Sequence, residues 1–373
     1  MIFTNVKRVV IKIGSALLIE RGASTIRSNW MRAICENVAT LKKNRLDVVI
    51  VSSGAIGIGR DVLSLTSTNL KLEEKQAAAA AGQIRLAHAW QESLAAHKIS
   101  VAQILLTPSD TEERRKHLNA RNTIESLLEL NAVPIINEND TVATEEIRFG
   151  DNDRLAARVS QMIGADLLIL LSDIDGLYSA DPKKFSDASF IPEVFELTEK
   201  IFAMAGEASP GNSSGGMVTK LAAAEIAMRA GCQVIIADGR AEHSLFKIGK
   251  ENRFTRFLPI DTPSNARKRW IAASVSHAGA IFIDSGAEHA LKSGSSLLPA
   301  GVISIKGNFD RGDTVTICDE SGHRLGCGIS AYSAKDTSLI LGQKSCEIEN
   351  LLGYRGRDEI IHRDNLVLDE KNF

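Results

Sequence analysis

Residues 134–153 read PIINENDTVATEEIRFGDND, a segment with six carboxylates and a single cation, Arg148. Buried carboxylates need partners, so this segment cannot belong to an apolar core. It follows an apolar run at 132–136 and leads into an amphipathic segment that starts at Leu155. The end of a strand and the start of a helix are the two places where an α/β sheet presents side chains to a ligand. We therefore expect half of a binding site for a small polar molecule here, with a solvated loop as the plain alternative.

Around this segment, apolar strand-like runs alternate with helical segments. The strands are continuous apolar runs, which is typical of a parallel sheet covered by helices on both faces. The expected fold class is α/β, a three-layer αβα sandwich around a mostly parallel sheet. The expected strands are Val9–Ile13, Val48–Val51, Val101–Leu106, Val133–Ile136, Leu167–Leu171 and Val234–Ala237, and the expected helices are about Ser28–Lys43, Glu74–His97, His117–Glu129 and Val218–Ala230.

Polar residues come directly after four of these strands. They are Ser53-Gly54, Asn137 to Asp140, Ser172-Asp173 and Asp238-Gly239. The carboxyl ends of parallel strands share one edge of a sheet, and ligands bind at that edge. We expect these four signals to meet there.

The length of 373 residues makes two domains the default. Residues 1–260 are expected to form the catalytic domain, and 261–275, with a basic cluster and a proline, a linker. Residues 276–373 are expected to form a small all-β domain, barrel-like or sandwich-like, because short strand candidates alternate with glycine-containing turns. Those candidates are Ala280–Ile283, Val302–Ile305, Thr314–Ile317 and Ser338–Leu341.

Composition narrows the class of protein further. The net charge of −2 argues against a chain that binds nucleic acid or a membrane over its whole length. No apolar run approaches the length of a membrane span, and the first residues lack a signal-peptide pattern. Five scattered cysteines without metal-ligand spacing indicate reduced thiols in the cytoplasm.

The sequence does not match two common nucleotide-binding motifs. No GxxxxGK[ST] motif occurs, which excludes a P-loop protein. Gly57-Ile58-Gly59 resembles a dinucleotide fingerprint, but Val62 occupies the third glycine position, so hydride transfer is disfavoured.

Two lysines indicate a phosphate site instead. GNSSGGMVTK at 211–220 leads into a helix, and its glycines and free N–H groups suit a phosphate. Lys220 then lies in the first helical turn, where a cation is unfavourable unless an anion is bound. Lys12 interrupts an apolar strand, which is costly unless the ammonium is paired or reaches solvent. A flexible loop and an exposed edge lysine are the alternatives; two lysines with several carboxylates favour phosphoryl transfer.

Together these segments resemble the amino acid kinase family, followed by a PUA domain. The resemblance covers nearly the whole chain. Its kinase motifs are VVIKIGS at 9–15, VIVSSGAIGIGR at 49–60, LNARNT at 118–123, the 134–153 segment, LLILLSDIDGLYSADP at 167–182 and SGGMVTKLAAAEIAMRAG at 214–231. Its PUA motifs are GSSLLPAGV at 294–302, GNFDRGDTV at 307–315 and GCGIS at 326–330.

The resemblance implies an amino acid kinase fold and ATP-dependent phosphorylation of the side-chain carboxylate of L-glutamate, the first step of proline biosynthesis. Lys12 and Lys220 would hold the ATP phosphates, and Asp153 would orient both lysines. The glutamate would be bound by Ser53, Asp140 and Asn152, with Asp140 facing its ammonium group. The nucleotide would be lined by Lys12, Ser172, Asp173, Ser214, Gly215, Gly216, Met217, Val218, Thr219 and Lys220.

The implied chemistry needs no general base, because the glutamate side chain is already ionised at neutral pH. Mg²⁺ would bridge the β- and γ-phosphates and keep several waters, which leaves few or no direct protein ligands. One departure from the family pattern is Asn212-Ser213-Ser214, where a Gly-Thr pair usually precedes GGM. Ser214 keeps the hydroxyl, so we expect ATP binding to survive.

The resemblance also implies partners. They are L-glutamate and ATP, proline as a feedback inhibitor that competes at the glutamate pocket, further copies of the chain in a homo-oligomer, and a functional link to glutamate-5-semialdehyde dehydrogenase.

Two alternatives stay open. Another family kinase, acting on acetylglutamate or isopentenyl phosphate, is disfavoured by the PUA tail and the NEND segment. An RNA-binding PUA protein is disfavoured because residues 276–373 contain ten Lys or Arg and fourteen Asp or Glu, a formal charge of −4.

Overall fold

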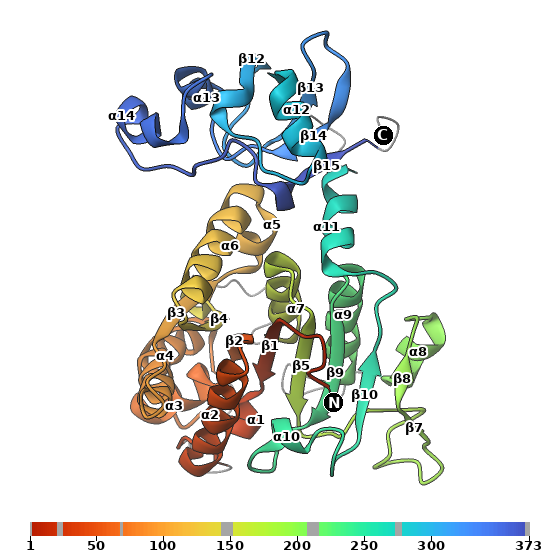
Figure 1. Ribbon diagram of the computed structural model, residues 1–373. Coiled ribbons are helices and arrows are strands. Elements are labelled where there is room, and N and C mark those ends of the chain that lie inside the picture. Colours follow the sequence, from red (N-terminus) through yellow and green to blue (C-terminus); the bar gives the residue numbers. More distant parts are fainter. Residues whose placement is uncertain are drawn as a thin grey trace. The chain divides into compact units, whose positions relative to one another are not determined.

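A computed structural model of the chain describes residues 2–20, 25–67, 70–142, 152–206, 216–272 and 278–369. Over these ranges the chain divides into two compact units, Met1–Pro263 and Ser264–Phe373. Figure 1 shows their helices and strands with the labels used below. We describe each unit by itself.

The large unit is built on an eight-stranded sheet with the strand order β3-β4-β2-β1-β5-β9-β10-β8. The first six strands in that order are mutually parallel, and β10 is antiparallel to β9. The strands are β1 (Arg8–Ile13), β2 (Asp47–Ser52), β3 (Val101–Leu106), β4 (Val133–Glu138), β5 (Leu167–Ser172), β8 (Glu193–Val194), β9 (Gln233–Asp238) and β10 (Phe254–Phe257), with a separate hairpin of β6 (Leu177–Tyr178) and β7 (Phe190–Ile191).

Helices cover both faces of this sheet. They are α1 (Ser15–Leu18), α2 (Ser28–Lys43), α3 (Ala55–Val62), α4 (Leu72–Ala95), α5 (Pro108–Glu112), α6 (Arg114–Glu129), α7 (Asn152–Ile163), α8 (Glu199–Met204), α9 (Met217–Arg229), α10 (Ser244–Lys247) and the 3₁₀ helix η1 (Asp140–Val142). Side chains of α2 and α4 pack on one face of the sheet, and side chains of α6, α7 and α9 pack on the other. The αβα sandwich predicted from the sequence is confirmed.

Successive residues of β1 point to opposite faces of the sheet. Val9, Ile11 and Ile13 belong to the core under α2 and α4, whereas Val10 belongs to the core under α7 and α9. Lys12 therefore points toward the α7 and α9 face. There α7 packs directly against α9 and against β1, as Figure 1 also shows.

Glycines bring α3 and α4 unusually close together. A Cβ atom on Gly59 would lie 1.7 Å from the Ala78 carbonyl oxygen, and one on Gly82 would lie 1.8 Å from the Ala55 carbonyl oxygen. Gly54, at the start of α3, has a φ of 115°, which side-chain-bearing residues rarely adopt. The glycines at 54–59 thus serve a tight strand-to-helix turn and helix packing.

The small unit holds a five-stranded sheet with the order β12-β11-β13-β14-β15. The strands are β11 (Gly279–Ile283), β12 (Val302–Gly307), β13 (Thr314–Cys318), β14 (Arg324–Ile329) and β15 (Leu366–Leu368). Its helical segments are α12 (Ser285–Lys292), α13 (Ala334–Ile340), α14 (Ile348–Leu352), η2 (Pro299–Gly301), η3 (Ser345–Glu347) and η4 (Arg363–Asn365). The segment expected to be a linker contains α11 (Pro263–Ala272).

The strand predicted at Ser338–Leu341 is wrong, because these residues lie in and directly after α13. Ser333 caps this helix by accepting a hydrogen bond from the Asp336 N–H, and the Ser333 hydroxyl also bonds the Asp336 carboxylate. A serine followed three residues later by an acid is a helix-start signal. It takes precedence over the short apolar run that suggested a strand.

Candidate active site

Three buried ionic side chains meet at the carboxyl edge of the large sheet. The Asp153 carboxylate lies between two ammonium groups, with Oδ1 2.7 Å from Lys12 Nζ and Oδ2 3.0 Å from Lys220 Nζ. The side chains of Asp153, Lys12 and Lys220 are 1%, 7% and 4% exposed, respectively. The structure thus excludes the alternative of an exposed lysine at position 12.

The fold explains why these groups meet. Asp153 lies in the first turn of α7, and Lys220 lies in the first turn of α9. The two helices pack side by side next to β1, which carries Lys12 on that face. Gly14 lies beside the Lys12 ammonium: a Cβ atom at this position would be in ordinary van der Waals contact with Nζ, at 3.7 Å.

Asp153 stays ionised in this environment. Burial alone would raise the pKa of its carboxyl group, but the Lys12 and Lys220 ammonium groups outweigh burial and lower the pKa to about 2. The Thr219 hydroxyl also donates to Asp153 Oδ2, at 3.0 Å. Within the described part of the chain, one carboxylate therefore contacts two ammonium groups.

A second group of polar side chains begins one residue earlier on α7. Asn152 Nδ2 donates to Ser53 Oγ at 2.8 Å and to Asn137 Oδ1 at 2.9 Å. Asn137 Nδ2 in turn donates to Gln83 Oε1 at 2.8 Å. These side chains come from α7, the end of β2, β4 and α4 and form one connected network.

Three atoms near this network have no hydrogen-bond partner within the described part of the chain. They are Asn152 Oδ1, Asp140 Oδ1 and Gln83 Nε2, and all three residues are at least nine-tenths buried. Unpartnered buried polar atoms are costly, so a site with two free acceptors and one free donor is suited to a ligand that carries both kinds of group.

Asp140 differs from Asp153 in its charge. Burial raises the pKa of its carboxyl group to about 7, and the neighbouring Glu138 carboxylate adds to the effect. Asp140 is therefore only partly ionised near neutral pH, and a cationic ligand group would draw it into the ionised form.

Apart from Lys12, the predicted nucleotide residues that the structure describes lie at the end of β5 and at the start of α9. Ser172 is the last residue of β5, and Asp173 follows it. The Gly239 N–H donates to the Ser172 carbonyl at 2.8 Å. Gly216 caps α9, and Met217, Val218 and Thr219 form its first turn with Lys220. Ser214 and Gly215 lie outside the described residues.

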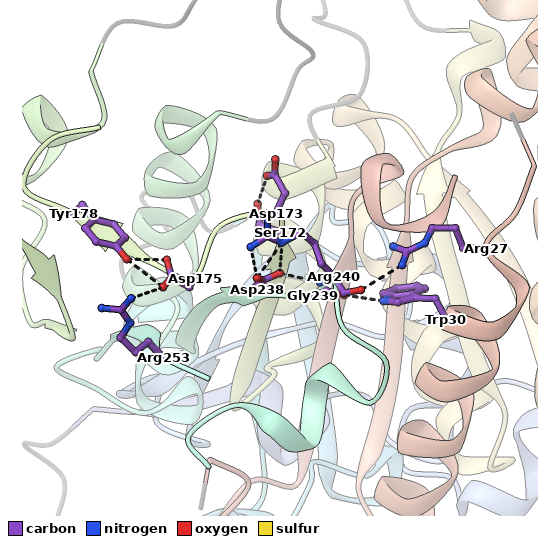
Figure 2. Close-up of polar contacts among 10 residues, drawn as sticks. All are labelled: Arg27, Trp30, Ser172, Asp173, Asp175, Tyr178, Asp238, Gly239, Arg240 and Arg253. Atoms are coloured by element: carbon purple, nitrogen blue, oxygen red, sulfur yellow. Dashed lines mark hydrogen bonds and ion pairs between the residues drawn. The ribbon is translucent and has the colours of Figure 1, made fainter. Parts of the chain in front are cut away.

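Figure 2 shows two of the predicted polar strand ends, Ser172-Asp173 and Asp238-Gly239, together with Arg240 and Trp30, which the sequence prediction did not include. Arg240 donates to both carboxylate oxygens of Asp238, next to Ser172 and Asp173. On the other side, the buried Trp30 indole N–H donates to the Gly239 carbonyl at 2.7 Å. These contacts fix the turn after β9 beside the Ser172 strand end.

Of the predicted site residues, the structure brings together Lys12, Asp153 and Lys220, and it joins Ser53 with Asn152. Asp140 makes no hydrogen bond or ion pair with these side chains in the described part of the chain. The sequence prediction did not assign Asn137 and Gln83 to the site, although they belong to the same hydrogen-bonded network as Asn152. Asn137 was part of a noted polar strand end, whereas Gln83 lies in an alanine-rich helix, where nothing in the local pattern marks it out.

Comparisons with known proteins show the family of this chain. The model of the amino acid kinase family matches residues 7–238, and the PUA domain model matches residues 279–352. The chain belongs to the amino acid kinase family.

Curated relatives within this family are similar over almost the full chain. The glutamate 5-kinase of Paramagnetospirillum magneticum is 56% identical over 363 residues, which cover 97% of this chain and 98% of the relative. The glutamate 5-kinase of Agrobacterium fabrum is 57% identical over 361 residues, 97% of this chain and 92% of the relative. The resemblance to the amino acid kinase family inferred from the motifs is confirmed.

The described residues offer neither a membrane span nor a metal-binding cluster. None of their helices has the length and apolar character to cross a membrane. They also contain no group of three or more His, Cys, Asp or Glu placed to hold a metal ion.

Replacing Asp153 with Asn is expected to lower the free energy of unfolding by about 3–5 kcal/mol near neutral pH, because two buried ammonium groups lose their counter-charge. The folded pKa of about 2 lies below the ordinary value of 3.8. The stabilisation is therefore complete above the ordinary pKa and is lost as the pH falls through the folded pKa.

Urea unfolding at several pH values checks this expectation. The difference between the wild type and Asp153→Asn should shrink between about pH 5 and about pH 2. The exposed Asp61→Asn is the matched control and should stay within about 0.5 kcal/mol of the wild type. A difference that remains constant across this pH range contradicts the ion-pair assignment.

Proposed function

We propose that this chain catalyses the transfer of the γ-phosphoryl group of ATP to the side-chain carboxylate of L-glutamate, which forms L-glutamyl 5-phosphate and ADP. The observation that carries the proposal is the Asp153 carboxylate held between the buried ammonium groups of Lys12 and Lys220. The names of the curated relatives support the same reaction.

In this mechanism a glutamate carboxylate oxygen attacks the γ-phosphorus, and the bond from that phosphorus to the β–γ bridging oxygen breaks. The glutamate carboxylate is already ionised, so the chain needs no general base. Catalysis then depends on position and charge. Lys12 and Lys220 neutralise the negative charge on the transferred group, and Asp153 holds both ammonium groups in place before ATP binds.

The nucleotide enters as its magnesium complex, so the metal is part of that substrate. The N-terminus of α9, which begins after Gly216, offers free backbone N–H groups to the phosphates. Ser172 and Asp173 at the end of β5 are assigned to the nucleotide, together with Ser214 to Lys220.

The amino acid is assigned to the other end of the site. Asn152 and Ser53 bind it directly, and Asp140 faces its ammonium group. The buried Asp140 carboxyl favours a free ammonium over an acetylated nitrogen, because an amide carries no charge to pair with the ionised form. This supports L-glutamate over acetylglutamate.

The remaining assignments follow from the family and the named reaction. The reaction would be the first step of proline biosynthesis in the cytoplasm, with proline competing at the glutamate pocket and glutamate-5-semialdehyde dehydrogenase consuming the product. The chain would act as a homo-oligomer with a catalytic domain at 1–260, a linker at 261–275 and a PUA domain at 276–373. The formal charge of −4 on the last of these supports a role other than RNA binding.

Trapping of the product tests the reaction. With ATP, free glutamate and hydroxylamine, the wild type should form the hydroxamate of the side-chain carboxyl group, and acetylglutamate should give far less. Lys220→Ala should lower kcat by about 10²–10³, because one donor to the transferred group is lost. The exposed Lys43→Ala should leave it unchanged. Equal turnover of both amino acids would contradict the proposed acceptor.

The pH dependence of glutamate binding tests the role of Asp140. Its pKa of about 7 means that the ionised form grows between about pH 6 and about pH 8, so KM for glutamate should fall over that range. Asp140→Asn should raise KM about 10- to 100-fold and remove the pH dependence, because a charged hydrogen bond is lost. If the variant keeps the wild-type pH profile, another group faces the ammonium.

A further inference from the structure

Gln83 lies at the glutamate end of the site, although the helix that carries it, α4, is rich in alanine. Its side chain is on the buried face of α4 with Ala78, Ala79 and Leu86. Two contacts bring α4 to the site. Gly82 touches the backbone of Ala55, two residues after Ser53, and α4 packs against η1, which carries Asp140.

The hydrogen bond with Gln83 decides which groups donate and which accept in the rest of the network. Gln83 Oε1 accepts from Asn137 Nδ2, so the Asn137 amide must present its oxygen on the other side. That oxygen accepts from Asn152 Nδ2, which also donates to Ser53. The Asn152 oxygen is thereby left free as an acceptor.

Gln83 also keeps one group for a ligand. Its Nε2 has no partner among the described residues, and the residue is only 9% exposed. A buried NH₂ group in this position needs an acceptor. Asn152 Oδ1 and Asp140 Oδ1, the free acceptors nearby, suit an ammonium group. An α-amino acid carries an ammonium group and a carboxylate on the same carbon, so it matches the two acceptors and the one donor.

We propose that Gln83 is a positioning and specificity residue for the amino acid substrate. Its carbonyl oxygen orients Asn137 and, through Asn137, Asn152. Its NH₂ group donates to the α-carboxylate of the substrate. The proposal rests on the proposed function, since it takes the acceptor of the phosphoryl group to be a free amino acid.

Steady-state kinetics of Gln83→Met test this role. The substitution keeps the size and flexibility of the side chain but removes both hydrogen-bonding groups. KM for glutamate should rise at least about tenfold, because a hydrogen bond to a charged group is lost. KM for ATP and kcat at saturating glutamate should stay within about threefold, since Lys12, Asp153 and Lys220 are untouched. Ile84→Met, at the next position and 74% exposed, is the matched control and should behave as the wild type.

A modified substrate separates recognition from a structural role. The α-carboxamide of glutamate (isoglutamine) keeps the reacting carboxylate but lacks the negative charge that Gln83 would meet. The wild type should strongly prefer glutamate, and Gln83→Met should lose about tenfold of that preference. A purely structural role would weaken both substrates by the same factor.

Gln83→Glu provides a second variant in case Gln83→Met folds poorly. Glutamate at this position can still accept from Asn137, but its ionised form cannot donate and repels the α-carboxylate. KM for glutamate should therefore rise when it is measured well below the melting temperature of the variant.

An unchanged KM for glutamate in both variants overturns the proposal. It is also overturned if Gln83→Met prefers glutamate over isoglutamine as strongly as the wild type does. Failure of the wild type to form the hydroxamate would instead overturn the proposed function itself, so the two failures are distinguishable.

Discussion

Two buried lysine ammonium groups that share one carboxylate are the constraint on which this active site depends. Each ammonium would be costly to bury alone, and Asp153 makes both possible by lying between them. The arrangement also fixes the fold locally. It requires β1 to place Lys12 on the α7 face, and it requires the first turns of α7 and α9 to lie at the same edge of the sheet.

The first turn of α7 joins the two halves of the site. Asn152 and Asp153 are adjacent in sequence, yet Asn152 bonds toward Ser53 and Asn137, whereas Asp153 bonds toward the two lysines. Consequently, a shift of this turn would move the amino acid end and the phosphate end together. That coupling suits in-line phosphoryl transfer, in which a small error in the separation of the reacting atoms slows the reaction strongly.

Much of the fold was predictable because its signals are local. Apolar runs such as Leu167–Leu171 mark buried parallel strands, and Lys12 in such a run was expected either to be paired or to reach solvent. The anion that Lys220 requires at its helix N-terminus turned out to include Asp153.

The rest of the site depends on packing that no local pattern encodes. Gln83 becomes part of the site only because Gly82 lets α4 approach the turn after β2. Burial raises the pKa of both Asp140 and Asp153, but the charge of Glu138 adds to the effect at Asp140, whereas two lysines outweigh it at Asp153. In the small unit, the cap at Ser333 decided in favour of a helix where apolar residues had suggested a strand.

A double-mutant cycle in kcat tests the central claim most directly. Lys12→Ala, Lys220→Ala and the double variant are compared with the wild type at saturating ATP and glutamate. If the two ammonium groups act as one unit on the transferred phosphoryl group, the double variant should be about as slow as the slower single variant. If the losses instead multiply, as they do for independent sites, the two lysines do not act together and the account is contradicted.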